Sequence, residues 1–333
     1  MRTGRMLLLS TLTLASCGPL HEEETALAER ADALWVDADA DGIDDGLEDQ
    51  LAAKFAPEVR LAPLSIDWAR PANVDWYLAR VHMRFDHSGC PDCQVLALAT
   101  PTQSNLSTQS HATKGTFCGH TSTVYYSNAS RKEFFLQPPD DAVHNGAPSS
   151  EWKVYVHSKK SALVAGGYDL QYWFFYPYND SYASVNHESD WEHITVTTDS
   201  AGNFYSAWYA AHSGGTRYSA SQLRWNGTHP IVYSADGSHA SYPTVGTYPT
   251  SVPGFSDHTY DGGPVWQTWN NWVNVGERGA PRNGQNFIKY GGRWGEIGET
   301  DATSGVQGPS FQGSWNTYEP SSVPVGGLGT RVG

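Results

Sequence analysis

The chain has 333 residues, with 35 acidic residues against 21 Lys and Arg residues and a formal net charge of -14. This balance argues against a nucleic acid partner, because phosphate neutralisation requires clustered basic side chains. Thirteen Trp, 18 Tyr and 33 Gly residues indicate β-rich structure with many turns, and the acidic surplus favours cation binding.

Residues 1–16 have the pattern of a secretory signal peptide. Arg2 and Arg5 precede the apolar stretch MLLLSTLTLAS, which is too short to span a bilayer. The sequence LASC resembles the lipobox of bacterial lipoproteins, which implies cleavage before Cys17, a lipid on that residue and a tether over residues 17–36. The alternative is an ordinary signal peptide with an incidental Cys. Either reading predicts an exported protein, lipid-anchored at the bacterial outer membrane or cell surface, or secreted.

Three further cysteines, Cys90, Cys93 and Cys118, are expected in an oxidising compartment. One disulfide and one odd thiol is the default expectation there. The alternative is a zinc site, in which His120 would join the three thiolates of CPDC and CGH.

The segment DADADGIDDGLE, residues 37–48, fits the pattern D-x-D-x-D-G-x5-E of calcium loops. Gly42 would permit the sharp turn. The expected oxygen ligands of a structural calcium ion are Asp37, Asp39, Asp41, Asp45 and a bidentate Glu48. Asp44 stands where EF-hand loops carry an apolar residue, and this departure makes the segment resemble bacterial thrombospondin-type-3 calcium loops. The alternative is an acidic linker.

A short helix is expected directly after this loop. Leu47, Leu51 and Phe55 repeat at helical spacing, and Pro57 ends the pattern. The calcium loop and helix together would occupy residues 37–56.

Residues 57–316 are predicted to form one all-β domain, an antiparallel β-sandwich with long loops. Its candidate strands are β-branched and aromatic, and clusters of Gly, Pro, Asn, Asp and Ser separate them without a clear helix between. The candidates are residues 74–85, 93–100, 122–127, 151–158, 168–178, 192–199, 204–212 and 229–236. Residues 317–333, rich in Pro, Gly and Ser, are expected to be a flexible tail.

The stretch from His187 to His193 is unusually dense in side chains that can bind metals. In a strand, Asp190 and Glu192 point to one face and Trp191 to the other, while His187 in a preceding turn could fold back toward the acids. One imidazole and two carboxylates suit a divalent cation with oxygen and nitrogen ligands. The same groups could perform general acid and base chemistry, or form only a charged turn.

Other ligand-type residues follow the ends of neighbouring strands. Asp180 ends the aromatic segment before the dense stretch, and a hairpin-like connection would bring it beside the proposed site. The later candidates are His212, His239, Asp257, His258 and Asp261. A His or Asp at successive strand ends is how a β scaffold assembles a site from its loops.

The motifs LQYWFFYPYND, NHESDWEHITV, YAAHSGG, VYSADGSHASYP and DGGPVW resemble the vacuolar-protein-sorting-62-like family over roughly residues 50–315. The central motif is also similar to the heptapeptide GHRHDWE of necrosis- and ethylene-inducing toxins. That resemblance implies a β-sandwich whose divalent cation helps to bind sugar head groups of membrane sphingolipids. It implies that the metal residues are His187, Asp190, Glu192 and, just upstream, Asp180. This chain departs from the heptapeptide at Asn186, Glu188 and Ser189.

Three functions fit these observations. The first is a toxin-like effector that binds a glycan or glycolipid head group, with Ca²⁺ or Mg²⁺ rather than Zn²⁺ at the central site. The second is a metal-assisted hydrolase of extracellular glycans or phosphoesters, whose catalytic candidates would be Glu192, His193, His212 and His239. The third is a structural surface lipoprotein. The expected partners are the head group and, through the lipid anchor, a membrane; we expect a monomer that binds no nucleic acid.

Overall fold

The computed structural model describes residues 35–86, 94–113, 124–127, 132–181 and 185–316. The chain divides after Val36, and the compact unit that contains both candidate sites begins at Asp37. The signal peptide, Cys17, the three other cysteines and the tail lie outside the described residues, so these expectations remain predictions. In the described part, no helix combines the length and the apolar character that crossing a bilayer requires.

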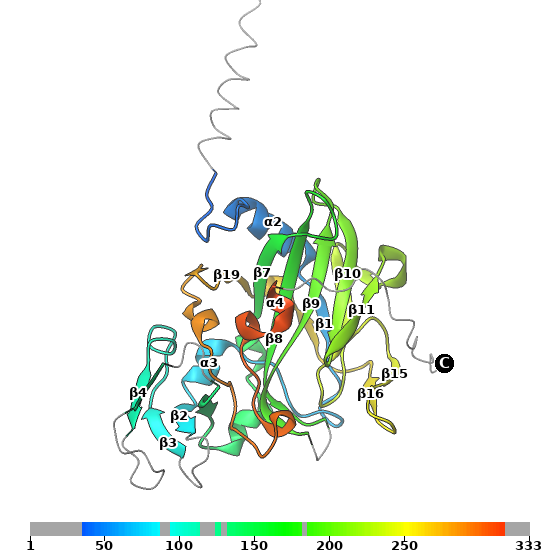
Figure 1. Ribbon diagram of the computed structural model, residues 1–333. Coiled ribbons are helices and arrows are strands. Elements are labelled where there is room, and N and C mark those ends of the chain that lie inside the picture. Colours follow the sequence, from blue (N-terminus) through cyan, green and yellow to red (C-terminus); the bar gives the residue numbers. More distant parts are fainter. Residues whose placement is uncertain (1–34, 87–93, 114–123, 128–131, 182–184, 317–333) are drawn as a thin grey trace, which may run out of the picture. The chain divides into compact units, whose positions relative to one another are not determined.

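The largest sheet in the described part has the strand order β11-β10-β9-β8-β7-β18 (Figure 1). Neighbouring strands are antiparallel except β7 and β18, which are parallel. The strands are β7 (Val154–Lys160), β8 (Tyr168–Asn179), β9 (His187–Thr198), β10 (Phe204–Ala211), β11 (Gly214–Tyr218) and β18 (Trp272–Asn274).

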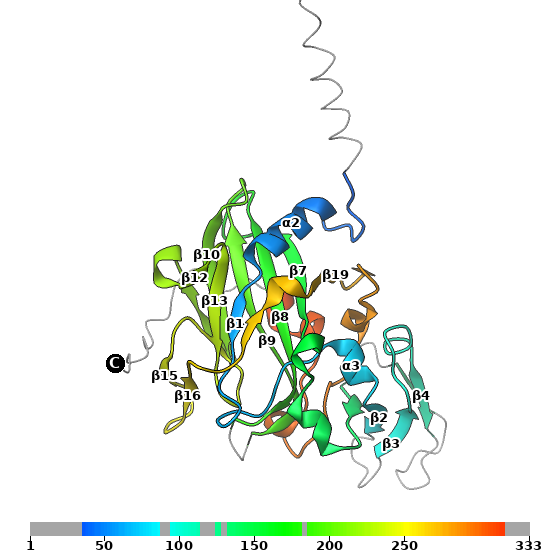
Figure 2. The same cartoon turned by 180° about the vertical axis from the view of Figure 1, so that it is seen from behind.

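A second sheet has the order β12-β13-β1-β17, with β14 also paired to β13 (Figure 2). Its strands are β1 (Glu58–Arg60), β12 (Trp225–Asn226), β13 (His229–Ser234), β14 (Ser241–Tyr242) and β17 (Val265–Gln267). The Tyr209 hydroxyl of the large sheet donates to the Ile231 carbonyl of this one over 3.0 Å. The predicted all-β, predominantly antiparallel sandwich is confirmed, with parallel pairings of β1 with β13 and of β7 with β18 added.

The remaining elements are short. The small ladders are β2 (His82–Asp86) with β3 (Gln94–Leu98) and β6 (Phe134–Gln137), β4 (Ser110–Thr113) with β5 (Val124–Ser127), β15 (Gly246–Pro249) with β16 (Ser256–Thr259), and β19 (Gly276–Glu277) with β20 (Ala280–Pro281). The helices are α2 (Asp45–Phe55), α3 (Val74–Leu78) and α4 (Gly313–Asn316). The 3₁₀ turns are η1 (Asp141–Asn145), η2 (Ser149–Glu151), η3 (Ala220–Gln222), η4 (Thr268–Asn270), η5 (Asn286–Lys289), η6 (Asp301–Thr303) and η7 (Pro309–Phe311).

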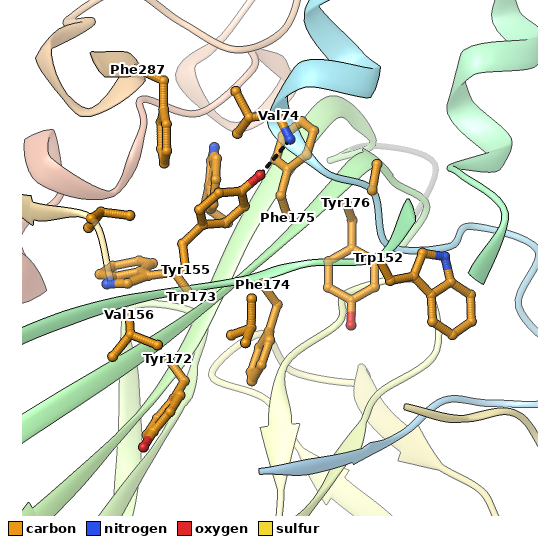
Figure 3. Close-up of a cluster of buried hydrophobic side chains, with 14 of the residues drawn as sticks. Val74, Trp152, Tyr155, Val156, Tyr172, Trp173, Phe174, Phe175, Tyr176 and Phe287 are labelled. Atoms are coloured by element: carbon orange, nitrogen blue, oxygen red, sulfur yellow. Dashed lines mark hydrogen bonds between the residues drawn. The ribbon is translucent and has the colours of Figure 1, made fainter. Parts of the chain in front are cut away.

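The core is aromatic on both faces of β8. Phe174 contacts Trp266 of the second sheet, at a centroid distance of 5.8 Å. On the other face Phe175 packs against Trp191 and Trp294. Figure 3 shows the part of this core around Phe174 and Phe175, in which the Tyr155 hydroxyl accepts a hydrogen bond from the Val74 amide over 2.7 Å. Burying β8 on both faces fixes its position, and β9 is aligned against it.

The structure corrects two local expectations. Residues 74–85 were predicted as one strand, but Val74–Leu78 form the helix α3 and only residues from His82 onward are extended. The Asn73 side chain caps this helix by accepting from the Trp76 amide over 2.7 Å, which overrides the strand-like pattern. His187 was expected in a turn, but it is the first residue of β9 and pairs with Asn179 of β8. The predicted helix after the acidic loop is confirmed as α2.

Candidate functional site

The dense stretch lies where β9 begins, and a break in the β8–β9 ladder shapes it. Tyr176 pairs with Asp190 and Tyr178 pairs with Glu188, but Pro177, which has no amide hydrogen, faces Ser189 between them. Ser189 has a φ of 61°, a left-handed conformation that is costly for a residue with a side chain. The His187 ring bonds the Ser189 carbonyl through Nδ1 over 2.8 Å, which leaves Nε2 for another partner.

Asp190 is buried and holds two other elements in place. Its Oδ2 accepts from the Asn179 amide over 3.2 Å and is bonded to His239 Nδ1 at 3.1 Å. His239 stacks face to face on Tyr176, with ring centroids 3.8 Å apart. The other nitrogen of His239 lies 3.8 Å from a carboxylate oxygen of Asp67. His239 is therefore fixed on three sides.

Glu192 differs from Asp190 because, within the described residues, no hydrogen bond from the protein reaches its carboxylate. Burial raises its pKa well above the ordinary value, and the nearby carboxylates of Asp190 and Asp257 raise it further. Such a carboxylate requires either a proton or a cation to offset its charge. Glu192 is therefore the cavity residue whose charge most requires a bound proton or cation.

His212 and Asp257 form a second acid and imidazole pair. His212 Nε2 lies 2.8 Å from Asp257 Oδ2, and this hydrogen bond raises the pKa of His212. Burial favours the neutral form of Asp257, but bonds from His212, from the Tyr242 hydroxyl at 2.6 Å and from the Ser238 hydroxyl at 2.8 Å outweigh it and lower the pKa of Asp257. The His212 side chain is 37% exposed, so its ring is accessible.

These groups border a cavity of about 410 Å³. One group of lining residues comes from β8, β9 and the segments that follow β10 and β13. A second group comes largely from the C-terminal segment and includes cationic, amide and aromatic side chains. The first group is Asn179, His187, Asp190, Trp191, Glu192, His212 and Ser238, and the second is Lys132, Arg293, Asp301, Val306, Gln307, Phe311 and Gln312.

The predicted site residues do not all meet in this cavity. Asp180 accepts from Trp68 Nε1 and from the Asn186 amide, and it lines a different cavity of about 270 Å³ with Asp67. His193 lies on the opposite face of β9, stacked on Trp173. His258, which the Thr247 hydroxyl contacts over 3.0 Å, lines the cavity of Asp180. Asp261 is exposed and bonds Tyr233.

Sequence reasoning missed several residues of the site. Asn179, rather than the adjacent Asp180, bonds Asp190. Neighbouring residues of a strand point in opposite directions, so an error of one residue exchanges Asn179 for Asp180 in the predicted site. Ser238 precedes His239, and Tyr242 follows it by three residues. The Gly/Ser loop that indicated His239 therefore also indicated these two residues. No motif near Asp67 in the sequence indicated that this residue belongs to the site.

The cavity residues do not form a closed ligand set in this structure. Groups of three ligand-type side chains whose atoms lie within 4.8 Å of one another occur, among the described residues, only in the N-terminal acidic loop. These groups are Asp37, Asp39 and Asp45, and Asp39, Asp41 and Glu48. The five acids of the predicted calcium loop fall into these two groups, and calcium binding by the loop stays a prediction.

Comparisons with known proteins point to the part of the chain that supplies β8, β9 and β10. Residues 128–252 match the family of vacuolar protein sorting-associated protein 62. The Saccharomyces cerevisiae protein of that name is 32% identical over 186 residues, which are 42% of this chain and 38% of the yeast protein. The yeast vacuolar protein sorting-associated protein TDA6 is 30% identical over 173 residues, 39% of this chain and 36% of its own. The resemblance predicted from the motifs is confirmed, and the chain spans under two fifths of each relative.

Solved structures similar to this chain include toxins. One described as a toxin fold for microbial attack and plant defense covers 83% of this chain and 90% of its own, with 14% identity and a TM-score of 0.38. NLPPya in complex with mannosamine covers 77% and 82%, with 14% identity and a TM-score of 0.36. Necrosis and ethylene inducing protein 2, from the causal agent of cocoa's witches' broom disease, covers 70% and 89%, with 15% identity and a TM-score of 0.31. Because all three scores are below 0.5, the proposals below rest on residues of this chain.

Proposed function

We propose that the cavity beside β9 binds the polyhydroxyl head group of a glycan or glycolipid with the help of a divalent cation. Glu192 carries this proposal, because its half-buried carboxylate lies near two others and accepts no hydrogen bond among the described residues. A cation would offset the charge, and it would also offer open coordination positions to ligand hydroxyls. In this proposal the chain is an exported, lipid-anchored, toxin-like effector, and mass spectrometry of Cys17 tests the anchor.

The cavity has suitable donors for such an ion. Asp190 uses only Oδ2 in its bonds with Asn179 and His239, and His187 keeps Nε2 available. A set richer in oxygen than in nitrogen suits Ca²⁺ or Mg²⁺ better than Zn²⁺. Since these donors are not gathered within 4.8 Å, Glu192, Asp190 and His187 would hold the ion together with water.

The lining residues from the C-terminal segment suit a sugar. The amide nitrogens of Gln307 and Gln312 donate to the Gly291 and Gln307 carbonyls, and each amide group keeps a second N–H for a ligand hydroxyl. Lys132 offers a charged donor, whereas Arg293 is bonded to Asp301 and the Gly305 carbonyl. Phe311 is half-buried, with Arg278 over its ring, and the rest of its surface is apolar. A cavity of about 410 Å³ is within the ordinary range for small-ligand sites.

The test measures binding of the full chain to a glycan array and to glycolipid vesicles, with Ca²⁺ or Mg²⁺ and then with a chelator. We expect Glu192→Gln and chelation each to weaken binding at least tenfold, and Asp141→Asn, which removes an exposed charge elsewhere, to change nothing. Affinities that stay within twofold after both treatments would rule out the cation-dependent site.

A specific observation supports a second candidate, the metal-assisted hydrolase. His212, oriented by Asp257, exposes its ring at the cavity, as a general base must. Turnover of glycosides or phosphodiesters that is lost in His212→Gln, while head-group binding survives, would favour this function over binding alone. Saturable binding without any turnover by the wild-type chain would exclude it.

A further inference from the structure

The N-terminal acidic loop contains a cluster of carboxylate oxygens that protein hydrogen bonds do not satisfy. Oxygens of Asp39, Asp41 and Glu48 lie within 4.8 Å of one another. In each of the three residues one carboxylate oxygen is buried and has no hydrogen-bond partner, as judged over the described residues. Asp39 is only 5% exposed and Glu48 only 1%. Three converging, buried oxygens without donors are costly unless a positive charge lies among them.

The other acids of the loop have different, structural tasks. Asp37 accepts from the Asp41 and Gly42 amides, at 3.2 and 3.0 Å, and these bonds close the turn. Asp45 accepts from the Ala38 amide over 3.2 Å. Asp44 caps α2 by accepting from the Leu47 amide over 3.0 Å. Its departure from the EF-hand pattern is therefore accounted for by a helix cap.

Among the described residues, Arg282 is the cation paired with this cluster, and within the cluster it reaches only Glu48. Arg282 donates to Oε2 of Glu48 over 2.6 Å, but Oε1 remains without a partner. Burial, followed by repulsion from Asp41, raises the pKa of Asp39 to about 6. Burial, followed by repulsion from Asp39 and Asp41, raises the pKa of Glu48 to about 8. The cluster is unfavourable when fully charged because its unpartnered, buried oxygens lie within 4.8 Å of one another, and an added cation would relieve this cost.

We propose that Asp39, Asp41 and Glu48 bind one Ca²⁺ ion, which fastens the acidic loop to the folded domain. The donors are all carboxylate oxygens, which suits a hard cation, and the loop supplies further oxygens through its backbone. An irregular oxygen shell favours Ca²⁺, because Mg²⁺ demands near-octahedral geometry and retains its water. This site shares no residue with the cavity beside β9, so it does not depend on the function proposed for that cavity.

The ion would join two parts of the chain that are distant in the sequence. Asp39 and Asp41 precede α2, Glu48 lies in its first turn, and Arg282 follows β20. Arg282 also contacts Asp49, at 3.3 Å. Figure 1 shows α2 and β19 near each other at the same end of the domain. By fixing Glu48 against Arg282, the ion stabilises the contact between the start of the compact unit and its later hairpin.

The experiment titrates Ca²⁺, and separately Mg²⁺, into the chelator-treated full chain by calorimetry and records thermal unfolding with and without the ion. We expect 1 mM Ca²⁺ to raise the wild-type Tm by roughly 5 °C. Asp39→Asn and Asp41→Asn should lose this rise and bind Ca²⁺ at least tenfold more weakly. In calcium-free buffer, Asp39→Asn should unfold at the wild-type temperature or above it, because it removes a buried charge.

Two control variants assign the result to this cluster. Asp141→Asn makes the same charge change at an exposed residue outside the three ligands and outside the contacts of Arg282, and should keep the Ca²⁺ effect. Any Ca²⁺ bound in the cavity beside β9 is removed from the comparison by repeating it in Glu192→Gln, where Asp39→Asn should abolish the remaining Ca²⁺ rise as it does in the wild type. The proposal is overturned if Ca²⁺ does not change the wild-type Tm, or if Asp39→Asn and Asp41→Asn respond to Ca²⁺ as the wild type does.

Discussion

The cavity beside β9 and the N-terminal acidic loop use the same acidic side chains in opposite ways. In the cavity, Asp190 and Asp257 are bonded to His239 and His212, so these acids are already engaged by the protein. In the loop, the three converging carboxylates each keep a buried oxygen without a partner. The comparison teaches that the acids to examine for an ion are those whose oxygens lack protein donors, which are the three loop acids and, in the cavity, Glu192.

The two regions differ in the hydrogen bonds of their acidic side chains, but both contain residues with positive φ. The described residues other than Gly that have positive φ are Ala40, Ser189, His212, His239 and Asn283. Ala40 lies in the acidic loop and Asn283 follows Arg282. His212 lines the cavity, and Ser189 and His239 bond the lining residues His187 and Asp190. Such conformations persist only where the surroundings enforce them, and they concentrate at functional sites. Both regions therefore show the strain expected of built sites.

The largest expected effect is on the free energy of unfolding without metal, which should fall more for a variant of the cavity than for a variant of the loop. Asp190→Ala leaves His239 Nδ1 and the Asn179 amide buried without their acceptor, and we expect it to cost about 3 kcal/mol. Asp39→Ala should cost less than about 1 kcal/mol in chelator-treated buffer, because it removes an unsatisfied charge. Urea unfolding of both variants measures this contrast. Equal losses would show that the loop acids are as engaged as those of the cavity.

A smaller effect is expected from Asp257→Asn and depends on pH. The lowered pKa of Asp257 means that its contribution to stability is present above 3.8 and is lost as the pH falls through the folded-state pKa. The raised pKa of His212 means that its contribution is present below 6.5 and is lost as the pH rises through the folded-state pKa. The stability difference between wild type and variant should therefore peak between pH 3.8 and 6.5, as measured by urea unfolding. A difference independent of pH would contradict the ion pair, and Asp141→Asn is the control.

The smallest effect is expected from Asp180→Asn. The resemblance to the toxins implied that Asp180 is a metal ligand, but its carboxylate bonds Trp68 and Asn186 in the neighbouring cavity. We expect cation and head-group affinities to stay within twofold of the wild type. A loss as large as that of Glu192→Gln would show that Asp180 moves into the cavity when the cation binds.

Local pattern was sufficient for much of the fold. The spacing of Leu47, Leu51 and Phe55 predicted α2, and alternation predicted the long central strands. The pattern failed at α3, where Asn73 caps a helix inside a segment of strand-like composition. The single capping bond from Asn73 favours a helix at the start of this segment. A composition averaged over twelve residues does not detect one such bond.

Sequence alone predicted the part of the candidate site that a single strand supplies. His187, Asp190 and Glu192 come from one strand and line one cavity, as expected. Asn179 was missed in favour of Asp180 because adjacent residues at a strand end point in opposite directions. Asp67 and Arg282 reach their partners from distant parts of the chain, so no sequence window contains both members of either contact.

The contact between Arg282 and Glu48 spans 234 residues of the sequence. If the chain is exported unfolded, as the proposed function implies, this contact closes only after nearly all of the domain has been translocated. Contacts so distant in sequence form late, since closing such a loop costs entropy that local pairings do not. An ion bound at this contact would therefore act mainly by slowing unfolding, and it would have little influence on the speed of folding. Outside the cell, where calcium is available to an exported protein, the acidic loop would serve as a lock on the finished domain.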